Sequence, residues 1–136
     1  ECRDFIDWGT LQDWNKYRDS YRTIFCDIDG VVVESACNYL KPYLGSTDAL
    51  RDNVDALNEL HKTGRVALIM TTARAEKYRQ VTIDQLERAG LVYDKLIMGL
   101  PHARRTVIND FAASNIYPSC TAINLHRDTE TLREFL

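Results

Sequence analysis

The sequence predicts an α/β fold with a mostly parallel central sheet and helices on both faces of that sheet. Short runs that are apolar throughout alternate with longer amphipathic stretches, and polar side chains follow several of the apolar runs. Strands of a parallel sheet covered on both faces read as continuous apolar runs, and amphipathic helices supply the crossovers between them. Because ligands bind such sheets at the carboxyl ends of the strands, the polar side chains there are the candidate site.

The apolar runs predict strands at 23–27, 66–70, 95–98, 106–109 and 121–125, and the amphipathic stretches predict helices at 48–62, 75–89 and 128–136. Ser46 or Thr47 is the expected N-cap of the helix at 48–62, and Gly64 and Gly90 follow two of the helices. Residues 1–22 form an aromatic arm with a short helix near 10–22, capped by Thr10. We expect packing rather than binding from this arm, and an α/β domain over 23–136.

Composition narrows the class of protein. The 136 residues suffice for one domain with one core, and 45% hydrophobic and 27% charged residues are ordinary for a globular chain. The net charge of −3 and the lack of a basic stripe argue against a nucleic-acid or anionic-membrane partner, since the densest positive cluster is His102, Arg104 and Arg105. No apolar stretch approaches membrane-spanning length. Four cysteines without a C-x-x-C pair indicate reduced thiols and a cytoplasmic location.

The most informative segment is 23–31, an apolar run that ends in Asp27 and Asp29 and is followed by Gly30. Two carboxylates one residue apart at the end of a buried strand are costly unless a cation or a reacting group offsets them. One could attack a phosphorus centre, and the other could move a proton. The alternative is a β-hairpin, because Asp-Gly is a strong turn signal and residues 31–33 could form the return strand.

Two further strand ends carry suitable groups. Thr71, Thr72 and Arg74 lie between a predicted strand and a predicted helix, where a hydroxyl and the helix N–H groups suit a phosphate. The alternative for the threonines is simple N-capping. Asn109 and Asp110 close another apolar run, and their oxygens could complete a magnesium shell with the carboxylates of the first strand. The alternative there is a strand-to-turn transition.

The order D-x-D-G, T-x-R and N-D over residues 23–127 resembles the haloacid dehalogenase-like superfamily, whose commonest members are magnesium-dependent phosphatases. The resemblance implies a three-layer, Rossmann-like fold. It implies that Asp27 is the nucleophile, which forms a phospho-aspartate, and that Asp29 is the general acid/base. Thr72, or the adjacent Thr71, would hold the phosphoryl group.

The same resemblance implies a Mg²⁺ cofactor. Asp27, the main-chain carbonyl of Asp29 and the Asn109–Asp110 pair would hold the ion, with Asp110 the preferred ligand of that pair. Asn109 stands where many relatives have an acid, which weakens the charge balance at the metal.

A second departure from the family concerns a lysine. The family often reads Gly-Lys-Pro shortly before the N-D motif, whereas this chain reads Gly99-Leu100-Pro101. Losing one such electrostatic donor commonly costs about a hundredfold or more in rate. Arg104 and Arg105 lie in the next loop and could fold back as substitutes. The change puts turnover in doubt more than the fold.

The gaps between motifs leave no room for a separate cap domain, so we expect an open site shielded by the loop at 38–43, the arm or another subunit. The stretch at 7–14 is similar to the closing segment of sugar-nucleotide-forming nucleotidyltransferases, with coincidence as the alternative. That similarity implies a domain cut from a longer fusion, or a stand-alone relative, in activated-sugar or surface-polysaccharide metabolism.

The sequence therefore predicts a magnesium-dependent phosphohydrolase acting on a small phosphorylated metabolite, such as a sugar or polyol phosphate. The first alternative is a catalytically weak domain that binds a phosphorylated ligand or regulates an attached nucleotidyltransferase. A phosphotransferase or mutase is a minor alternative. Expected protein partners are a second copy of the chain or the fused nucleotidyltransferase domain.

Overall fold

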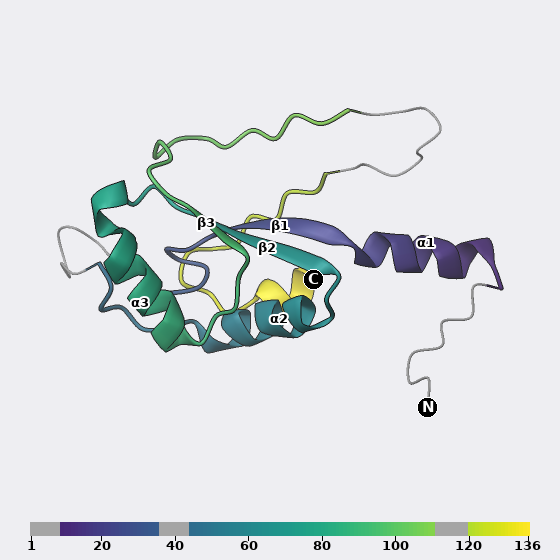
Figure 1. The fold of residues 1–136 in the computed structure, drawn as a ribbon, viewed down its shortest axis with the longest axis horizontal. Coiled ribbons are helices and arrows are strands. Elements are labelled where there is room, and N and C mark those ends of the chain that lie inside the picture. Colours follow the sequence, from purple (N-terminus) through teal and green to yellow (C-terminus); the bar gives the residue numbers. More distant parts are fainter. Residues whose placement is uncertain (1–8, 36–43, 111–119) are drawn as a thin grey trace.

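The computed structural model describes residues 9–35, 44–110 and 120–136. Its centre is a parallel sheet of β1 (Arg22–Asp27), β2 (Val66–Thr71) and β3 (Lys95–Ile97), in the order β1-β2-β3 (Figure 1). Helices α2 (Arg51–Lys62) and α3 (Arg79–Ala89) connect consecutive strands, and a 3₁₀ turn, η1 (Glu76–Tyr78), precedes α3. The α/β prediction with a parallel sheet is confirmed.

Both connecting helices lie on one face of the sheet. Right-handed crossovers that step in the same direction place their helices on the same side, and α2 and α3 both run below the sheet in Figure 1. On the opposite face Phe25 remains 59% exposed and Ile97 40% exposed. Within residues 9–35, 44–110 and 120–136, no helix covers that face, so the second helical layer that the sequence predicts is not seen there.

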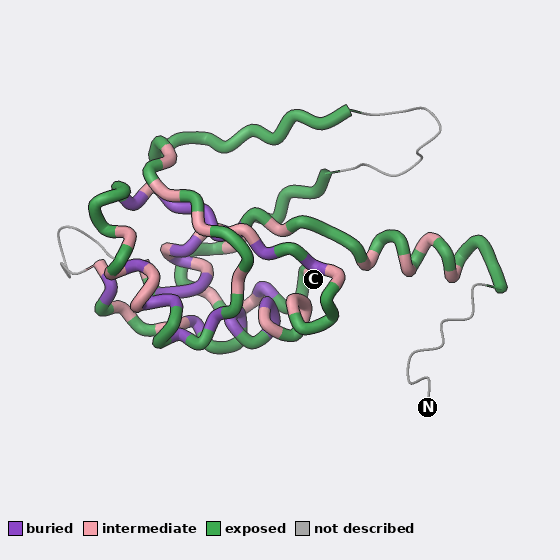
Figure 2. The backbone as a smooth tube through the Cα atoms, in the orientation of Figure 1, coloured by how far each residue is buried: buried purple, intermediate pink, exposed green. Residues whose placement is uncertain are grey.

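The core fills the space between the sheet and these two helices (Figure 2). Leu68 and Met70 of β2 meet Leu57 of α2 and Leu86 of α3, each at most 1% exposed. Alternate residues of β2 are buried because successive side chains of a strand point to opposite faces. The core thereby fixes which face of each strand turns toward the helices.

Two predicted strands are absent. Residues 106–109 and 121–125 form no strand, and the apolar side chains of Val107, Ile108 and Ile123 are 63%, 91% and 40% exposed. An apolar, β-branched run becomes a strand only when a neighbouring strand pairs with its backbone. The described structure supplies no such partner for either run, so sequence preference alone was not enough.

The predicted C-terminal helix at 128–136 is also wrong, because only a 3₁₀ turn, η2 (Leu132–Phe135), forms there. Asp128 adopts a positive φ of 61°, which breaks helical geometry at the expected start. The backbone N–H of Leu132 donates to the side chain of Asn53, at 3.0 Å, instead of to a preceding turn. This tertiary contact replaces the helical bond and buries Leu132 against α2.

Helix α2 begins later than predicted and uses a distant cap. Neither Ser46 nor Thr47 caps it, because the helix starts at Arg51 and its N-cap residue, Leu50, makes no side-chain cap bond. The Arg51 N–H donates instead to Glu130 Oε1, at 3.1 Å. A carboxylate from the C-terminal segment thus satisfies an open donor of the first turn.

The helix predicted for the arm is confirmed as α1 (Leu11–Ser20). The expected packing of this helix against the rest of the domain is not seen among the described residues. Thr10 Oγ1 accepts from the Asp13 N–H at 3.2 Å, as an N-cap does. No residue of α1 is buried, and the helix projects away from the sheet (Figure 1). Its aromatic rings contact one another, with Trp14 and Tyr17 centroids 6.5 Å apart and Tyr17 and Tyr21 centroids 5.2 Å apart. Residues 1–8 of the arm and the loop at 38–43 lie outside the described residues.

The loop after β1 winds tightly instead of turning back as a hairpin. The carbonyl of Ile28 accepts from the N–H groups of Val31, Val32 and Val33, at 3.4, 3.0 and 3.2 Å. Gly30 has a φ of 88°, and its carbonyl accepts from the Asp128 N–H at 3.0 Å. The hairpin alternative is therefore wrong, since Val31 and Val32 lie in a turn and Val33 makes only isolated bridges, to Asp29 and Ala49, with no antiparallel ladder to β1.

We predict that Gly30→Ala destabilises the fold more than Gly64→Ala. Both glycines have positive φ, which costs an L-residue about 1–2 kcal/mol. A Cβ on Gly30 would also lie 2.9 Å from Arg127 Cγ, whereas a Cβ on Gly64 would meet nothing within 4 Å. Urea unfolding of both variants measures the difference, and equal losses would show that the close approach to Arg127 has no energetic weight.

Candidate functional site

The candidate site lies at the carboxyl end of β1, where Asp27 closes the strand and Asp29 follows it. The neighbouring side chains Cys26 and Ile28 are turned into the core, at 7% and 0% exposure. The two carboxylates stay at the surface, with 38% and 27% of their side chains exposed. The alternation of the strand thus presents two carboxylates while the residues between and before them anchor the segment.

Arg74 holds the second carboxylate. Its Nη2 donates to Asp29 Oδ1 at 2.6 Å, and its Nε donates to Asp29 Oδ2 at 2.9 Å. This is a two-bond, planar pairing of guanidinium and carboxylate, the strongest form of side-chain hydrogen bonding between charges. The side chain of Arg74 is only 3% exposed, so the pair is largely shielded from water. It joins the ends of β1 and β2 across the site.

The remaining terminal nitrogen of Arg74 is also used. Nη1 donates to Thr82 Oγ1 at 3.2 Å and to Gln85 Oε1 at 2.9 Å, both on α3. Arg74 is therefore a buried structural partner of Asp29 in this structure, while its predicted binding of phosphate stays a prediction. Its place after β2 was predicted from sequence, but the direction of its side chain depends on α3.

Thr71 and Thr72 lie at the carboxyl end of β2, next to the two aspartates, but both threonines are buried there. Thr72 is 1% exposed, and its Oγ1 accepts from the Arg74 N–H at 3.1 Å. Thr71 is 7% exposed, and its Oγ1 donates to the Cys26 carbonyl at 3.2 Å. The hydroxyl proton of Thr72 remains a donor that a phosphate oxygen could accept, although the residue is buried in this conformation.

Arg105 reaches the first carboxylate. Its Nη1 lies 3.4 Å from Asp27 Oδ2 and its Nη2 lies 3.4 Å from Asp27 Oδ1. Both side chains are about half exposed, at 46% and 38%. The structure records no ion pair between Asp27 and Arg104, the residue that precedes Arg105 in the sequence. One of the two arginines considered as substitutes for the missing lysine thus contacts the candidate nucleophile.

Leu100 lies in a loop that is fastened to the second motif. The Leu100 N–H donates to the Thr72 carbonyl at 3.2 Å, and the Gly99 N–H donates to the Arg74 carbonyl at 2.8 Å. These bonds bring the 99–100 segment next to the end of β2. The chain therefore carries an apolar side chain, and no cation, at this position beside the site.

The proposed metal ligands do not all converge. Asn109 and Asp110 belong to an exposed, irregular segment, where the Asp110 N–H donates to Asn109 Oδ1 at 3.2 Å. Within the part of the chain that the structure describes, no three His, Cys, Asp or Glu side chains group as metal ligands. Residues 106–109 form no strand, so the expected strand does not deliver Asn109 and Asp110 to the sheet edge where Asp27 lies.

The buried thiol beside the site is not a second nucleophile. Burial, followed by the neighbouring charge of Asp27, raises the pKa of Cys26 to about 12. The nucleophilic form of cysteine is the thiolate, which is scarce near neutral pH at that pKa. Cys26 therefore acts as a small apolar core residue.

Sequence reasoning missed the buried polar residues Gln85 of α3 and Asn53 of α2. Gln85 and Thr82 are 3% and 0% exposed, and Asn53 of α2 is 0% exposed. Asn53 Nδ2 donates to the carbonyls of Val31 and Thr129, at 2.8 Å each. A polar residue on the apolar face of a predicted helix was the available signal, since such a group is buried only with partners.

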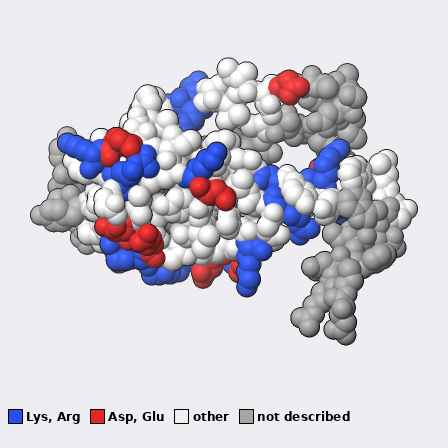
Figure 3. Space-filling model, viewed as in Figure 1, with Lys and Arg blue, Asp and Glu red and all other residues white. Residues whose placement is uncertain are grey.

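The surface and the helices add little about partners. Lysine and arginine side chains are interspersed with acidic ones on the face drawn in Figure 3. None of the described helices has the length and apolar character needed to span a bilayer.

Comparison with known proteins gives distant structural likeness only. No protein-family model matches the chain, and no curated protein matches it. A crystallised target from Vibrio cholerae is 16% identical, with a TM-score of 0.48, over 64% of this chain and 79% of that one. A chain of a Pnkp1/Rnl/Hen1 complex is 22% identical, with a TM-score of 0.49, over 62% of this chain and 30% of that one.

A chain of a Pnkp1/Rnl/Hen1 RNA repair complex gives 22% identity and a TM-score of 0.48, over 62% of this chain and 28% of that one. The match thus spans about three-tenths of the length of the chains in these complexes. At these TM-scores and identities the comparisons carry no argument about what this chain does.

We predict that Arg74→Met lowers the free energy of unfolding by roughly 3 kcal/mol, because it leaves a partly buried carboxylate without its cation. Arg79→Met is the matched control, since Arg79 pairs with Glu76 at the surface of the neighbouring turn and α3. Such exposed pairs contribute little. Chemical unfolding of both variants tests this, and equal, small losses would show that the Arg74–Asp29 pair does not stabilise the fold.

Proposed function

We propose that this chain is a magnesium-dependent phosphohydrolase of the haloacid dehalogenase-like superfamily. It would act through a phospho-aspartate on a small phosphorylated metabolite, such as a sugar or polyol phosphate. The observation that carries the proposal is the contact of Arg105 with Asp27, at 3.4 Å for both nitrogen–oxygen pairs. It provides a cation at the nucleophile in a chain whose sequence lacks the family lysine.

A cation is needed there because attack brings an anionic carboxylate onto an anionic phosphate. Fixed positive charge at that point stabilises the transition state more than the separated reactants. Arg105 is about half exposed and its bonds to Asp27 are long, so its guanidinium can also bind a phosphate oxygen without leaving a buried partner. Arg74 cannot take this role because Asp29, Thr82 and Gln85 occupy its nitrogens.

The proposed chemistry has two displacements. A carboxylate oxygen of Asp27 attacks phosphorus, the bond from phosphorus to the leaving oxygen breaks, and Asp29 gives that oxygen a proton. A water oxygen then attacks phosphorus and loses a proton to Asp29. The bond from Asp27 to phosphorus breaks, inorganic phosphate leaves, and both carboxyl groups return to their starting states. The two bonds from Arg74 orient Asp29 for these transfers.

The donor set fits Mg²⁺ in part. This ion is commonly held by one or two carboxylates together with substrate phosphate oxygens, and it keeps several waters. Asp27 and the main-chain carbonyl of Asp29 would be the protein ligands here, whereas Asp110 and Asn109 do not join them in this conformation. When bound, the ion would supply positive charge to the phosphoryl oxygens.

The alternative is a domain that binds a phosphorylated ligand without turning it over. Two observations favour it: Leu100 replaces the family lysine, and both oxygens of Asp29 are engaged by Arg74. Activity measurements separate the two candidates.

We predict magnesium-dependent release of phosphate from at least one member of a panel of sugar and polyol phosphates. The release should stop in Asp27→Asn, which keeps the shape of the side chain but removes the nucleophile. Phosphate is measured colorimetrically, with and without a chelator. No release from any substrate, with Mg²⁺ still bound by calorimetry, would favour the binding domain. Release that persists in Asp27→Asn would exclude the phospho-aspartate.

We predict that Arg105→Met lowers kcat/KM by roughly 10²-fold, the usual cost of one electrostatic donor at a transition state. Arg104→Met is the matched control, because Arg104 is adjacent and equally charged but the structure records no ion pair between it and Asp27. It should change kcat/KM by less than about threefold. Equal losses in the two variants would point to the general positive charge of this loop instead of a specific contact.

A further inference from the structure

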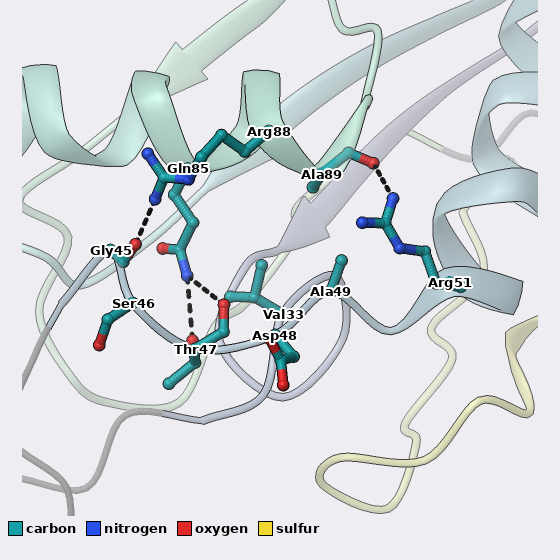
Figure 4. Close-up of a pocket in the computed structure, with 10 residues that line it drawn as sticks. All are labelled: Val33, Gly45, Ser46, Thr47, Asp48, Ala49, Arg51, Gln85, Arg88 and Ala89. Atoms are coloured by element: carbon teal, nitrogen blue, oxygen red, sulfur yellow. Dashed lines mark hydrogen bonds between the residues drawn. The ribbon is translucent and has the colours of Figure 1, made fainter.

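A buried polar chain leads from Asp29 into helix α3 and on to the segment before α2. Arg74 is fixed at one edge by its two bonds to Asp29, and its Nη1 is fixed by Thr82 Oγ1 and Gln85 Oε1. Gln85 Nε2 donates in turn to the Thr47 carbonyl at 3.1 Å and to Thr47 Oγ1 at 3.0 Å. Figure 4 shows Gln85 extending from α3 to Thr47.

The amide of Gln85 can adopt only one orientation in this chain. Its nitrogen has two donors and no acceptor, and its oxygen has only acceptor capacity. Turning the amide over would set its N–H groups against the donor nitrogens of Arg74 and its oxygen against the Thr47 carbonyl. Because Gln85 is 3% exposed, no bulk water would compensate the lost bonds. Thr47 therefore fixes the amide, and the amide fixes Arg74.

The chain of bonds closes on itself. The carbonyl of Asp48, next to Thr47, accepts from the Glu34 N–H at 2.9 Å, and the Leu50 N–H donates to the Val32 carbonyl at 2.9 Å. Both partners belong to the loop that leaves Asp29. The loop after β1, the end of β2, helix α3 and the segment before α2 are thus joined in one ring of contacts.

Removing one residue from such a ring of hydrogen bonds changes the positions of other residues in the ring, including residues that it does not contact. Two bonds to Asp29 fix the planar guanidinium of Arg74 relative to that carboxylate, but both side chains have rotatable bonds, so the pair could still move as a unit relative to α3. Gln85 and Thr82 remove that freedom, and Gln85 is the member that links Arg74 to another segment. Small displacements of a proton-transfer group cost large factors in rate.

We infer that Gln85 is a positioning residue, which holds the Arg74–Asp29 pair in one geometry and couples it to Thr47. The coupling is a property of the fold, and its effect on turnover rests on the proposed function. Gln85 touches no reacting atom, so its contribution acts through Arg74.

The test compares Gln85→Met with Gln80→Met. Methionine keeps the length and approximate shape of glutamine without its amide. Gln80 is the matched control because it lies on the same helix, is exposed, and bonds only Asp84 in the described structure, at 2.8 Å. Thermal unfolding confirms that both variants are folded at the assay temperature.

The first readout does not need activity. Hydrogen exchange of the Arg74 Nε–H group, followed by NMR, should speed up at least tenfold in Gln85→Met and stay within twofold of wild type in Gln80→Met. Unchanged exchange in Gln85→Met would overturn the inference, whatever the enzyme assay shows. Faster exchange in a protein that releases no phosphate would support the coupling and count against the proposed function alone.

The second readout is the division between kcat and KM. Gln85→Met should lower kcat at least tenfold and change KM by less than about twofold, because Asp29 moves protons whereas Arg105 and Asp27 meet the phosphate. Gln80→Met should leave both constants near the wild-type values. An active wild type with unchanged kcat in Gln85→Met would overturn the positioning role, and a rise in KM without a fall in kcat would do the same.

Discussion

The buried pairing of Arg74 with Asp29 is the interaction on which the site depends. A guanidinium that is almost entirely shielded from water is tolerated only when opposite charge and hydrogen-bond acceptors surround it, and here Asp29, Thr82 and Gln85 provide both. The pair joins the ends of β1 and β2 to α3. Its consequence is that one carboxylate of the D-x-D motif is held rigidly while the other, Asp27, stays accessible.

That difference between the two carboxylates gives the site its chemical character. Asp27 meets a half-exposed guanidinium, that of Arg105, at 3.4 Å, so this guanidinium is free to bind another anion as well. Asp29 has a buried partner that cannot exchange without leaving several donors unsatisfied. Two identical residues, separated by one residue, thereby stand in different surroundings, which suits the different roles proposed for them as nucleophile and proton-transfer group.

Most of the fold could be predicted from the sequence where local residue patterns decide the structure. The apolar runs gave β1, β2 and β3, the periodicity gave α2 and α3 within a few residues of their observed starts, and Thr10 capped α1 as expected. The failures came where a distant group decides. Residues 106–109 and 121–125 need a pairing strand, the start of α2 is set by Glu130, and the expected C-terminal helix gives way to a bond between Leu132 and Asn53.

By itself the sequence determined the class of fold and the placement of Asp27, Asp29 and Thr72 at neighbouring strand ends, because strand periodicity and strand order are properties of local pattern. Only the tertiary structure decided which way Arg74 points, which arginine reaches Asp27, and that residues 106–109 form no strand. These choices depend on long side chains and irregular segments, whose conformations are set by partners far away in the chain and not by their own residue types.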